Sequence, residues 1–526
     1  MNMKRISKCA ALLIALLMIL SLYGCGKADD AALRVGLTGL NAVPDPAMVV
    51  TDSERIVVSH LYENLMKLSP DSEGCMQAVP AQARSFHCED ELDGTQTYTF
   101  TLRDDLTWSD GQPVTANDFV YTWQRLVDPA TKSPNAYLLS VVAGYDQARS
   151  KNDPTLLQVT AEDDDTLVVR LNCRCPYFLS SVCTAAATMP VRSDGVVATN
   201  GIYCLASQDN NHLLLTARSD YYDKKRVYTS ALNFTFCQSS AELSALYDEG
   251  NLDLILAQPG EGDAENAIAY PRTGVLLINQ SAPAMKSESL RQAMSLVIDR
   301  NAMVEELNGA YTAADGLVSS NILADGSITF RENNGALIDN DAGHYADNCA
   351  AAHEKMVDAG YDSDTAMAAL GKMTLLYERG EKNEKIVTRL CQVWKDELKL
   401  TVTPIATDDM ATALKKGEFT MVLTDVTGNY NDATTFLNTF RSTAGENYGH
   451  FRSSAYDMLL RVAATSSNAE ARNAYLEDAE RLLLEKGGVI PLYGYGCHYQ
   501  LREGLTGLVS NGVGVYYFSA VTEAAK

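Results

Sequence analysis

Cys25 is the residue whose surroundings most clearly prepare it for a chemical modification. It ends the short segment 22–25, behind an apolar run over 10–22 that follows three basic residues. A basic start, a short apolar run and small residues before a cysteine are typical of a cleaved export signal, and the run is too short for a comfortable membrane span. We expect residues 1–24 to be a lipoprotein signal peptide. Acylated Cys25 would then hold a tether over 25–32 at the outer face of a bacterial cytoplasmic membrane.

The remaining cysteines could form disulfides in that compartment. The chain has 12 cysteines, and ten remain once Cys9 in the leader and Cys25 are set aside. An even number outside the cytoplasm permits pairing, and we expect Cys75 to pair with Cys88. One or two further pairs are expected within a second group, which comprises Cys173, Cys175, Cys183, Cys204 and Cys237. The first two of that group lack the second C-x-x-C or histidine pair that zinc needs, so we expect no metal site.

Catalytic patterns are missing from the sequence. None of the seven histidines belongs to an H-E-x-x-H motif, a spaced metal pair or a recognisable triad. There is no P-loop, and no G-x-G-x-x-G follows a predicted strand. The net charge of −24 disfavours nucleic acid and anionic lipid headgroups as partners. We therefore expect a protein that is not an enzyme and needs no cofactor.

Strand and helix patterns alternate along the chain, which indicates a mixed α/β body. Residues 97–102 and 166–171 alternate at a period of two and are predicted strands. The predicted helices cover 115–127, 286–307, 383–398 and 468–486. Thr115 is the expected N-cap of the first helix, and Gly487 ends the last. The 526 residues suffice for two or three cores of ordinary domain size.

Residues 98–125 carry the most specific pattern in the chain, with Trp108-Ser109-Asp110-Gly111 at its centre. Further short patterns accompany it in a fixed order, at 61–65, 200–203, 218–223, 278–300, 429–437 and 489–493. Together they resemble the motifs of bacterial extracellular solute-binding protein family 5, and in particular the oligopeptide-binding lipoproteins of ABC importers. With the pattern at 98–125, these six further motifs in one register are far more specific than any one of them alone.

The resemblance implies a two-lobed α/β fold of the periplasmic-binding-protein-like class II type, with an extra subdomain and a ligand cleft between the lobes. Lobe I would comprise 33–61, 189–274 and 489–526, the extra subdomain 62–188, and lobe II 275–488. The chain would cross between the lobes near 274–276 and 488–492, where glycines suit a hinge. The motif aromatics Trp108, Phe119 and Trp123 are expected in the core.

The resemblance also implies a ligand site, and here the chain departs from the family. In oligopeptide binders, an aspartate at the position of Asn429 pairs with the α-ammonium group of the peptide. Asn429 carries no charge to offset the desolvation of that ammonium group. Asp425 or Asp432 could supply the missing carboxylate. We favour Asp425, because Asp432 follows an acidic position that usually plays a structural part in the family. Tyr493 and Tyr495 are expected near the hinge, closing over the ligand.

Val50, Thr51 and Asp52 lie where the peptide ligands of relatives pair along the main chain, as an added strand does. Such pairing uses only backbone groups and does not depend on the side chains of the ligand, so it could persist despite the change at Asn429.

Two functions remain open from the sequence. The first is a monomeric capture subunit that binds oligopeptides or related small solutes outside the cell and delivers them to an ABC permease. The second is a sensory or chaperone-like lipoprotein of the same fold that binds a non-peptide solute or a protein partner. The altered ligand site is what keeps the second function open.

Overall fold

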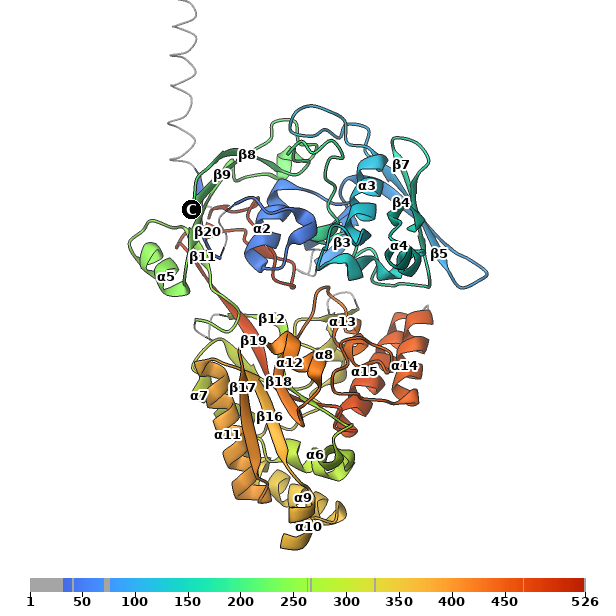
Figure 1. Cartoon of the computed structure of the whole chain (residues 1–526). Coiled ribbons are helices and arrows are strands. Elements are labelled where there is room, and N and C mark those ends of the chain that lie inside the picture. The colour runs from blue at the N-terminus through green and yellow to red at the C-terminus, as the bar shows by residue number, and fades with distance from the viewer. Residues whose placement is uncertain are drawn as a thin grey trace, which may run out of the picture.

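The computed structural model describes residues 32–39, 42–70, 76–262, 264, 267–325, 328–466 and 468–524. These residues form two lobes, drawn one above the other in Figure 1. The upper lobe holds the first half of the described chain together with its C-terminal end, and the lower lobe holds the part between them. The predicted two-lobed α/β fold is confirmed. The predicted signal peptide and the lipid site at Cys25 lie outside the described residues, as does all of the tether except its last residue.

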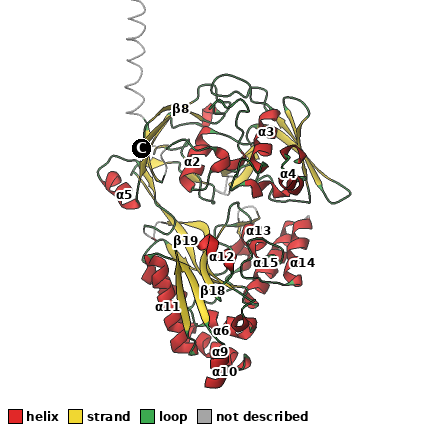
Figure 2. Ribbon diagram, in the orientation of Figure 1, coloured by secondary structure: helices red, strands yellow, loops and turns green. Residues whose placement is uncertain are grey.

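One 11-stranded sheet runs through both lobes. Its lower part follows the order β17 (Val402–Thr407), β16 (Met373–Glu378), β18 (Met421–Thr427), β12 (Ala267–Ile278) and β19 (Val489–Leu501). Its upper part continues with β11 (Leu254–Leu256), β1 (Leu33–Thr38), β10 (Ala231–Cys237), β9 (His212–Ala217) and β8 (Tyr203–Gln208). A short strand, β13 (Tyr311–Ala313), also pairs with β19. This sheet, whose strands are among those drawn yellow in Figure 2, is continuous from the lower lobe into the upper lobe.

β19 is the element that joins the two parts of this sheet. Its residues up to His498 pair antiparallel with β12, and Tyr499–Leu501 pair with β11. The pairing of β12 with β19 shifts register between Tyr270 and Thr273. The crossing that we predicted near 274–276 falls inside this paired stretch. The division of the chain at 274/275 and 488/489 stays a prediction.

The upper lobe also contains a separate four-stranded sheet, which lies on the right of Figure 1. Its order is β4 (Ala83–Asp90), β5 (Gln96–Leu102), β7 (Thr166–Leu171) and β6 (Val159–Ala161). β5 and β7 confirm the two predicted strands. Trp108, Phe119 and Trp123 are at most 1% exposed, which confirms their predicted place in the core.

Three of the four predicted helices are confirmed. α3 (Ala116–Val127) begins at Thr115, which forms a capping box with Asp118. α11 (Glu381–Leu398) and α15 (Ala469–Glu485) match the other two, and α15 ends at Gly487, whose φ is +56°. The further helices of four or more residues are α2 (Asp52–Leu61), α4 (Tyr145–Lys151), α5 (Ser240–Asp248), α8 (Phe330–Asn334), α9 (Tyr345–Asp358), α10 (Asp364–Ala369), α12 (Met410–Lys416), α13 (Thr434–Leu437) and α14 (Ser454–Thr465), besides the 3-10 turns.

The single helix predicted over 286–307 is wrong. The structure has α6 (Glu288–Leu296) and α7 (Arg300–Leu307), with a break at 297–299. Asp299 adopts an extended conformation and accepts a hydrogen bond from the Ala302 N–H, so it caps the second helix. Arg300 is 3% exposed, and its Nε donates to the Pro491 carbonyl at 2.8 Å. After the break, the Arg300 side chain thus contacts the backbone of β19.

The predicted disulfides are wrong for the described cysteines. All nine of them are free thiols, including Cys88 and the whole group from Cys173 to Cys237. Cys75, the predicted partner of Cys88, lies outside the described residues. Several of these thiols, such as Cys183 and Cys237, are buried among apolar side chains, where a cysteine behaves as a small hydrophobic residue.

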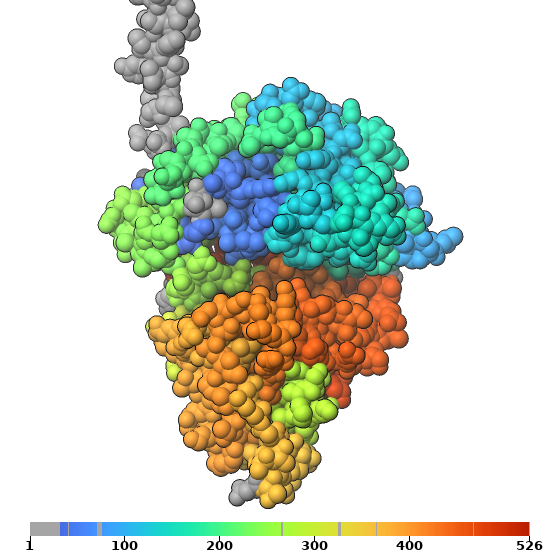
Figure 3. Space-filling model, viewed as in Figure 1, coloured from blue at the N-terminus to red at the C-terminus, as the bar shows by residue number. Residues whose placement is uncertain are grey.

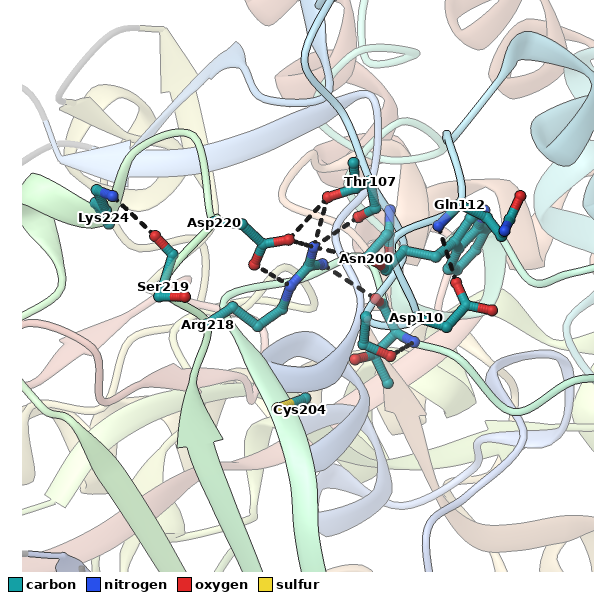
Figure 4. A network of polar contacts seen from close by, with 12 residues as sticks. Thr107, Asp110, Gln112, Asn200, Cys204, Arg218, Ser219, Asp220 and Lys224 are labelled. Carbon is teal, nitrogen blue, oxygen red and sulfur yellow. Dashed lines mark hydrogen bonds and ion pairs between the residues drawn. The ribbon is translucent and has the colours of Figure 1, made fainter.

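Three of the sequence motifs meet in one polar network of the upper lobe, shown in Figure 4. Arg218 is 8% exposed and donates to the carbonyls of Thr107, at 2.8 Å, and Thr199, at 3.1 Å. Its guanidinium also pairs with Asp220 at 2.9 Å. The backbone N–H of Arg218 bonds the Ile202 carbonyl at 2.9 Å. These hydrogen bonds thus join the three motif segments to one another within the upper lobe.

Within the described part of the chain, no helix is both long and apolar enough to cross a membrane.

Candidate functional site

A chamber lies where the two lobes meet, and we call it the central chamber. The upper lobe contributes α2, the segment 180–187 and the segment 511–517, with Arg55, Ser181 and Tyr517 among the lining residues. The bridging strand β12 contributes Tyr270, and the lower lobe contributes the loop 428–430 that follows β18. The chamber has only about 60 Å³ of free space. Figure 3 shows the two lobes meeting along a seam on the face in view.

Two larger cavities adjoin the central chamber. The lateral cavity, of about 550 Å³, lies between the four-stranded sheet and the lower lobe, and it shares Ser180 with the central chamber. The second cavity, of about 400 Å³, lies in the upper lobe, the predicted lobe I, and we call it the lobe I cavity. It shares Ser59, Thr184 and Tyr517 with the chamber. An extended ligand that passes through the central chamber therefore has room for side groups on both sides.

Tyr177 and Tyr430 bridge the lobes beside the chamber. Their rings stack with centroids 4.8 Å apart and an interplanar angle of 12°. Tyr177 belongs to the upper lobe and lines the lateral cavity, whereas Tyr430 belongs to the lower lobe and lines the central chamber. The stack is therefore a direct contact between the two lobes.

The predicted strand-pairing segment is engaged in capping α2. Thr51 is the N-cap, and the Glu54 carboxylate accepts from the N–H groups of Val50, at 2.7 Å, and Thr51, at 2.8 Å. The Asp52 carboxylate accepts from the hydroxyl of Tyr270, in the bridging strand β12, at 2.7 Å. Both N–H groups before Asp52 are thus already used, and pairing of a ligand strand with this segment stays a prediction.

Asn429 lines the central chamber and is exposed. Its backbone N–H donates to Thr435 Oγ1 at 2.9 Å, which fixes the loop after β18. Asp432 pairs with Arg472 at 2.8 Å in a nearly buried ion pair and caps the turn at Thr434. This geometry agrees with the structural part that we predicted for Asp432.

Asp425 of β18 lies together with Tyr493 and Tyr495 of the bridging strand β19, outside the lining of the central chamber. The Tyr495 hydroxyl donates to Asp425 at 3.0 Å, and Lys382 Nζ donates to the same hydroxyl at 2.6 Å. Burial lowers the pKa of Lys382, and the Asp425 carboxylate opposes that shift. Tyr493 is 1% exposed and packs against Gly274, where a Cβ would lie 2.3 Å from the Tyr493 ring. Asp425 is exposed and already accepts from the Tyr495 hydroxyl, to which Lys382 also donates.

Sequence reasoning missed three residues of this interface, namely Arg55, Ser181 and Tyr177. One local signal was available for Arg55, because it stands three residues after Asp52 at the start of a capped helix, where side chains of opposite charge pair. No local pattern marks Ser181 or Tyr177, since each becomes part of the site only when the lobes come together.

The two lobes, the bridging strands and the chamber between them define an extracellular solute-binding protein. The family described as bacterial extracellular solute-binding proteins, family 5, middle region, matches residues 77–448. This chain belongs to that family.

Named relatives and solved structures agree with this assignment. The periplasmic murein peptide-binding protein MppA of Escherichia coli K12 is 28% identical over 498 residues, covering 89% of this chain and 88% of that protein. The probable deoxycholate-binding periplasmic protein YgiS of the same organism is 30% identical, covering 85% of each. The unliganded open form of MppA superposes with a TM-score of 0.78 at 26% identity, covering 94% of this chain and 97% of that one. Haemophilus influenzae OppA in complex with the peptide RPPGFSPFR gives 0.68 at 25% identity, covering 94% and 99%.

Proposed function

We propose that this protein captures peptides outside the cell and delivers them to the permease of an ABC importer. The observation that carries the proposal is the chamber between the lobes. A ligand held there contacts both lobes and stabilises their closed arrangement, which is the state that a transporter must distinguish from the open one. Relatives whose names specify murein peptides and oligopeptides support peptides as the ligand class.

The protein would act as a monomer held at the outer face of the membrane by acylated Cys25. Two acyl chains bind a membrane far more firmly than one, since each buried methylene contributes about 0.8 kcal/mol. Substitution of Cys25 by alanine should release the protein from the membrane fraction. Membrane retention of that variant would contradict the anchor.

A second candidate function is the binding of a non-peptide solute. One relative, at 30% identity, is named a probable deoxycholate-binding protein. The position that holds an aspartate in oligopeptide binders is Asn429 here, and the central chamber contains no acidic side chain among its described lining residues. A sensory or chaperone-like role would use the same chamber.

The experiment that separates these functions is mass spectrometry of the molecules released on denaturing the purified protein. A ladder of short peptides supports the capture subunit. A single non-peptide mass supports the second function. An empty chamber would move the question to calorimetry with peptide and bile-acid panels.

Asp425 is the residue that we propose to bind the α-ammonium group of a peptide. Its substitution by alanine should weaken peptide binding several-fold and leave folding intact, because a charge-assisted hydrogen bond is lost. Asp408, which is 77% exposed and pairs with Arg379 on the surface of the same lobe, is the matched control. Equal peptide affinities of the two alanine variants, measured by calorimetry, would remove Asp425 from the site.

A further inference from the structure

We infer that Arg55 and Ser181 bind a carboxylate group of the ligand in the central chamber. The inference rests on the proposed binding function and deepens it, because it assigns the charge of the ligand and the residues that recognise it. At the boundary between the lobes, Arg55 and Ser181 each have a polar group without a hydrogen-bond partner.

Arg55 offers donors that the protein itself does not use. Its Nη2 donates to Asp52 Oδ1 at 2.6 Å, while its Nε is buried without a partner. A guanidinium carries five N–H donors in a fixed planar fork that matches the two oxygens of a carboxylate. A buried donor without an acceptor is unfavourable, so a ligand oxygen that reaches Arg55 would relieve that cost.

Ser181, which also lines the chamber, carries a second group without a hydrogen-bond partner. It is 4% exposed, and its Oγ has no hydrogen-bond partner. Its backbone N–H bonds the Tyr177 carbonyl at 2.9 Å, so the turn that carries Ser181 is fixed. Two residues with unsatisfied buried groups, one from α2 and one from the turn over 177–185, therefore line one chamber.

The charge of the chamber favours an anion. Arg55 is the one charged side chain among the described residues that line it, and the others are hydroxyl, amide and apolar groups. Asp52 offsets part of that charge, although its carboxylate also accepts from Tyr270. An α-ammonium group placed here would find no carboxylate in the lining. A carboxylate would gain a bidentate, charge-assisted contact.

The geometry also orients the ligand. The central chamber is small, whereas the lateral and lobe I cavities that adjoin it are large. The carboxylate would occupy the narrow centre, and the side groups next to it would extend into the two larger spaces.

Calorimetry on the full chain tests this inference with ligands that differ in one charge. The first pair is trialanine and trialanine C-terminal amide, and the second is deoxycholate and its methyl ester. The carboxylate member should bind at least about tenfold more tightly in the wild type. Arg55→Met should abolish that difference in affinity, and Arg55→Lys should keep part of it. Ser181→Ala should lower the affinity for the carboxylate ligand several-fold. Arg125→Met, which breaks the Arg125–Asp45 ion pair elsewhere in the upper lobe, is the matched control and should keep the full difference.

The outcomes separate this inference from the proposed function. Equal binding of trialanine and its amide by the wild type would overturn the inference and leave peptide capture standing. Discrimination that survives in Arg55→Met, with a thermal unfolding midpoint like that of the wild type, would overturn it too. Binding of deoxycholate alone, with its dependence on Arg55, would support the inference and reject peptides as the ligand class. Binding of none of the four ligands would count against both.

Discussion

At the scale of single residues, the family motifs of this chain stabilise the lobes, and the residues nearest to the chamber lie mostly between motifs. The Glu63 carboxylate accepts from the Tyr221 hydroxyl at 2.6 Å, and the Asn200 side chain donates to the Glu63 carbonyl at 2.8 Å. At Gly201 a Cβ would lie 2.8 Å from the Leu61 backbone, so no larger residue fits there. These contacts explain why the motifs identify the fold more strongly than they identify the ligand.

Arg218 should therefore be a residue on which the stability of the upper lobe depends. Arg218→Met removes charged donors from the carbonyls of Thr107 and Thr199 inside a nearly buried network. We expect the free energy of unfolding to fall by about 2–4 kcal/mol, because hydrogen bonds of a charged group contribute about 1.5–3 kcal/mol. The measurement is urea unfolding followed by circular dichroism. Arg226→Met, whose side chain is 78% exposed, should change stability little, and equal losses in the two variants would contradict the network.

At the scale of elements, α2 is the helix that positions the chamber, and His60 docks it onto the C-terminal segment. His60 is 1% exposed, and its Nε2 accepts from the Phe518 N–H at 3.1 Å. Its Nδ1 lies 2.7 Å from the Ile56 carbonyl and so carries the ring proton that donates to it. Both nitrogens are committed with the imidazole neutral, so protonation of Nε2 would break the contact with Phe518.

This arrangement predicts a loss of stability in acid. Burial lowers the pKa of His60 from 6.5 to about 4. The unfolded chain therefore takes up a proton between these values while the folded chain does not, so the contribution of His60 is complete above pH 6.5 and declines as the pH falls toward 4. At pH 5 the loss should be about 2 kcal/mol, at about 1.4 kcal/mol for each pH unit.

Urea unfolding between pH 7 and pH 5 checks this prediction. His60→Gln should lose less stability across that range than the wild type, whatever its stability at pH 7. His344→Gln is the control, because His344 is exposed and pairs with Asp339, which raises its pKa. A wild-type pH dependence that persists unchanged in His60→Gln would exclude His60 as its source.

Elements were predictable from the sequence where the deciding interactions are local. The cap at Thr115 and the alternation of β5 and β7 need only their own residues, and both predictions hold. The break before Arg300 is marked by the cap at Asp299 and leaves the helical periodicity of the segment unchanged, and its contact with a carbonyl of β19 lies nearly two hundred residues away, so periodicity alone could not reveal it. The chamber is harder still, because its lining comes from segments near 49–59, 135–138, 180–187, 270, 428–430 and 511–517.

At the scale of the whole molecule, the two lobes contact each other beside the chamber, so substitutions at those contacts should change the separation of the lobes. The Tyr177–Tyr430 stack is one such contact, and the Asp52–Tyr270 hydrogen bond joins α2 to the bridging strand β12. The described structure superposes with a higher TM-score on the unliganded open form of MppA, 0.78, than on a second MppA structure, 0.70. Both contacts are therefore present in an arrangement that superposes better on the open form of MppA than on that second structure.

Tyr177→Ala should increase the separation of the lobes in the ligand-free protein and lower the affinity for the ligand. An aromatic pair contributes about 0.5–1.5 kcal/mol beyond its buried area, which shifts the ratio of two arrangements by up to about tenfold. Small-angle X-ray scattering should then give a larger radius of gyration for the variant without ligand, and the two proteins should converge once ligand closes the lobes. Tyr228→Ala is the matched control, because Tyr228 is 66% exposed on the upper lobe. An unchanged radius with an unchanged affinity would mean that the stack only fills space, and the bridging strands β12 and β19 alone would then set the separation of the lobes.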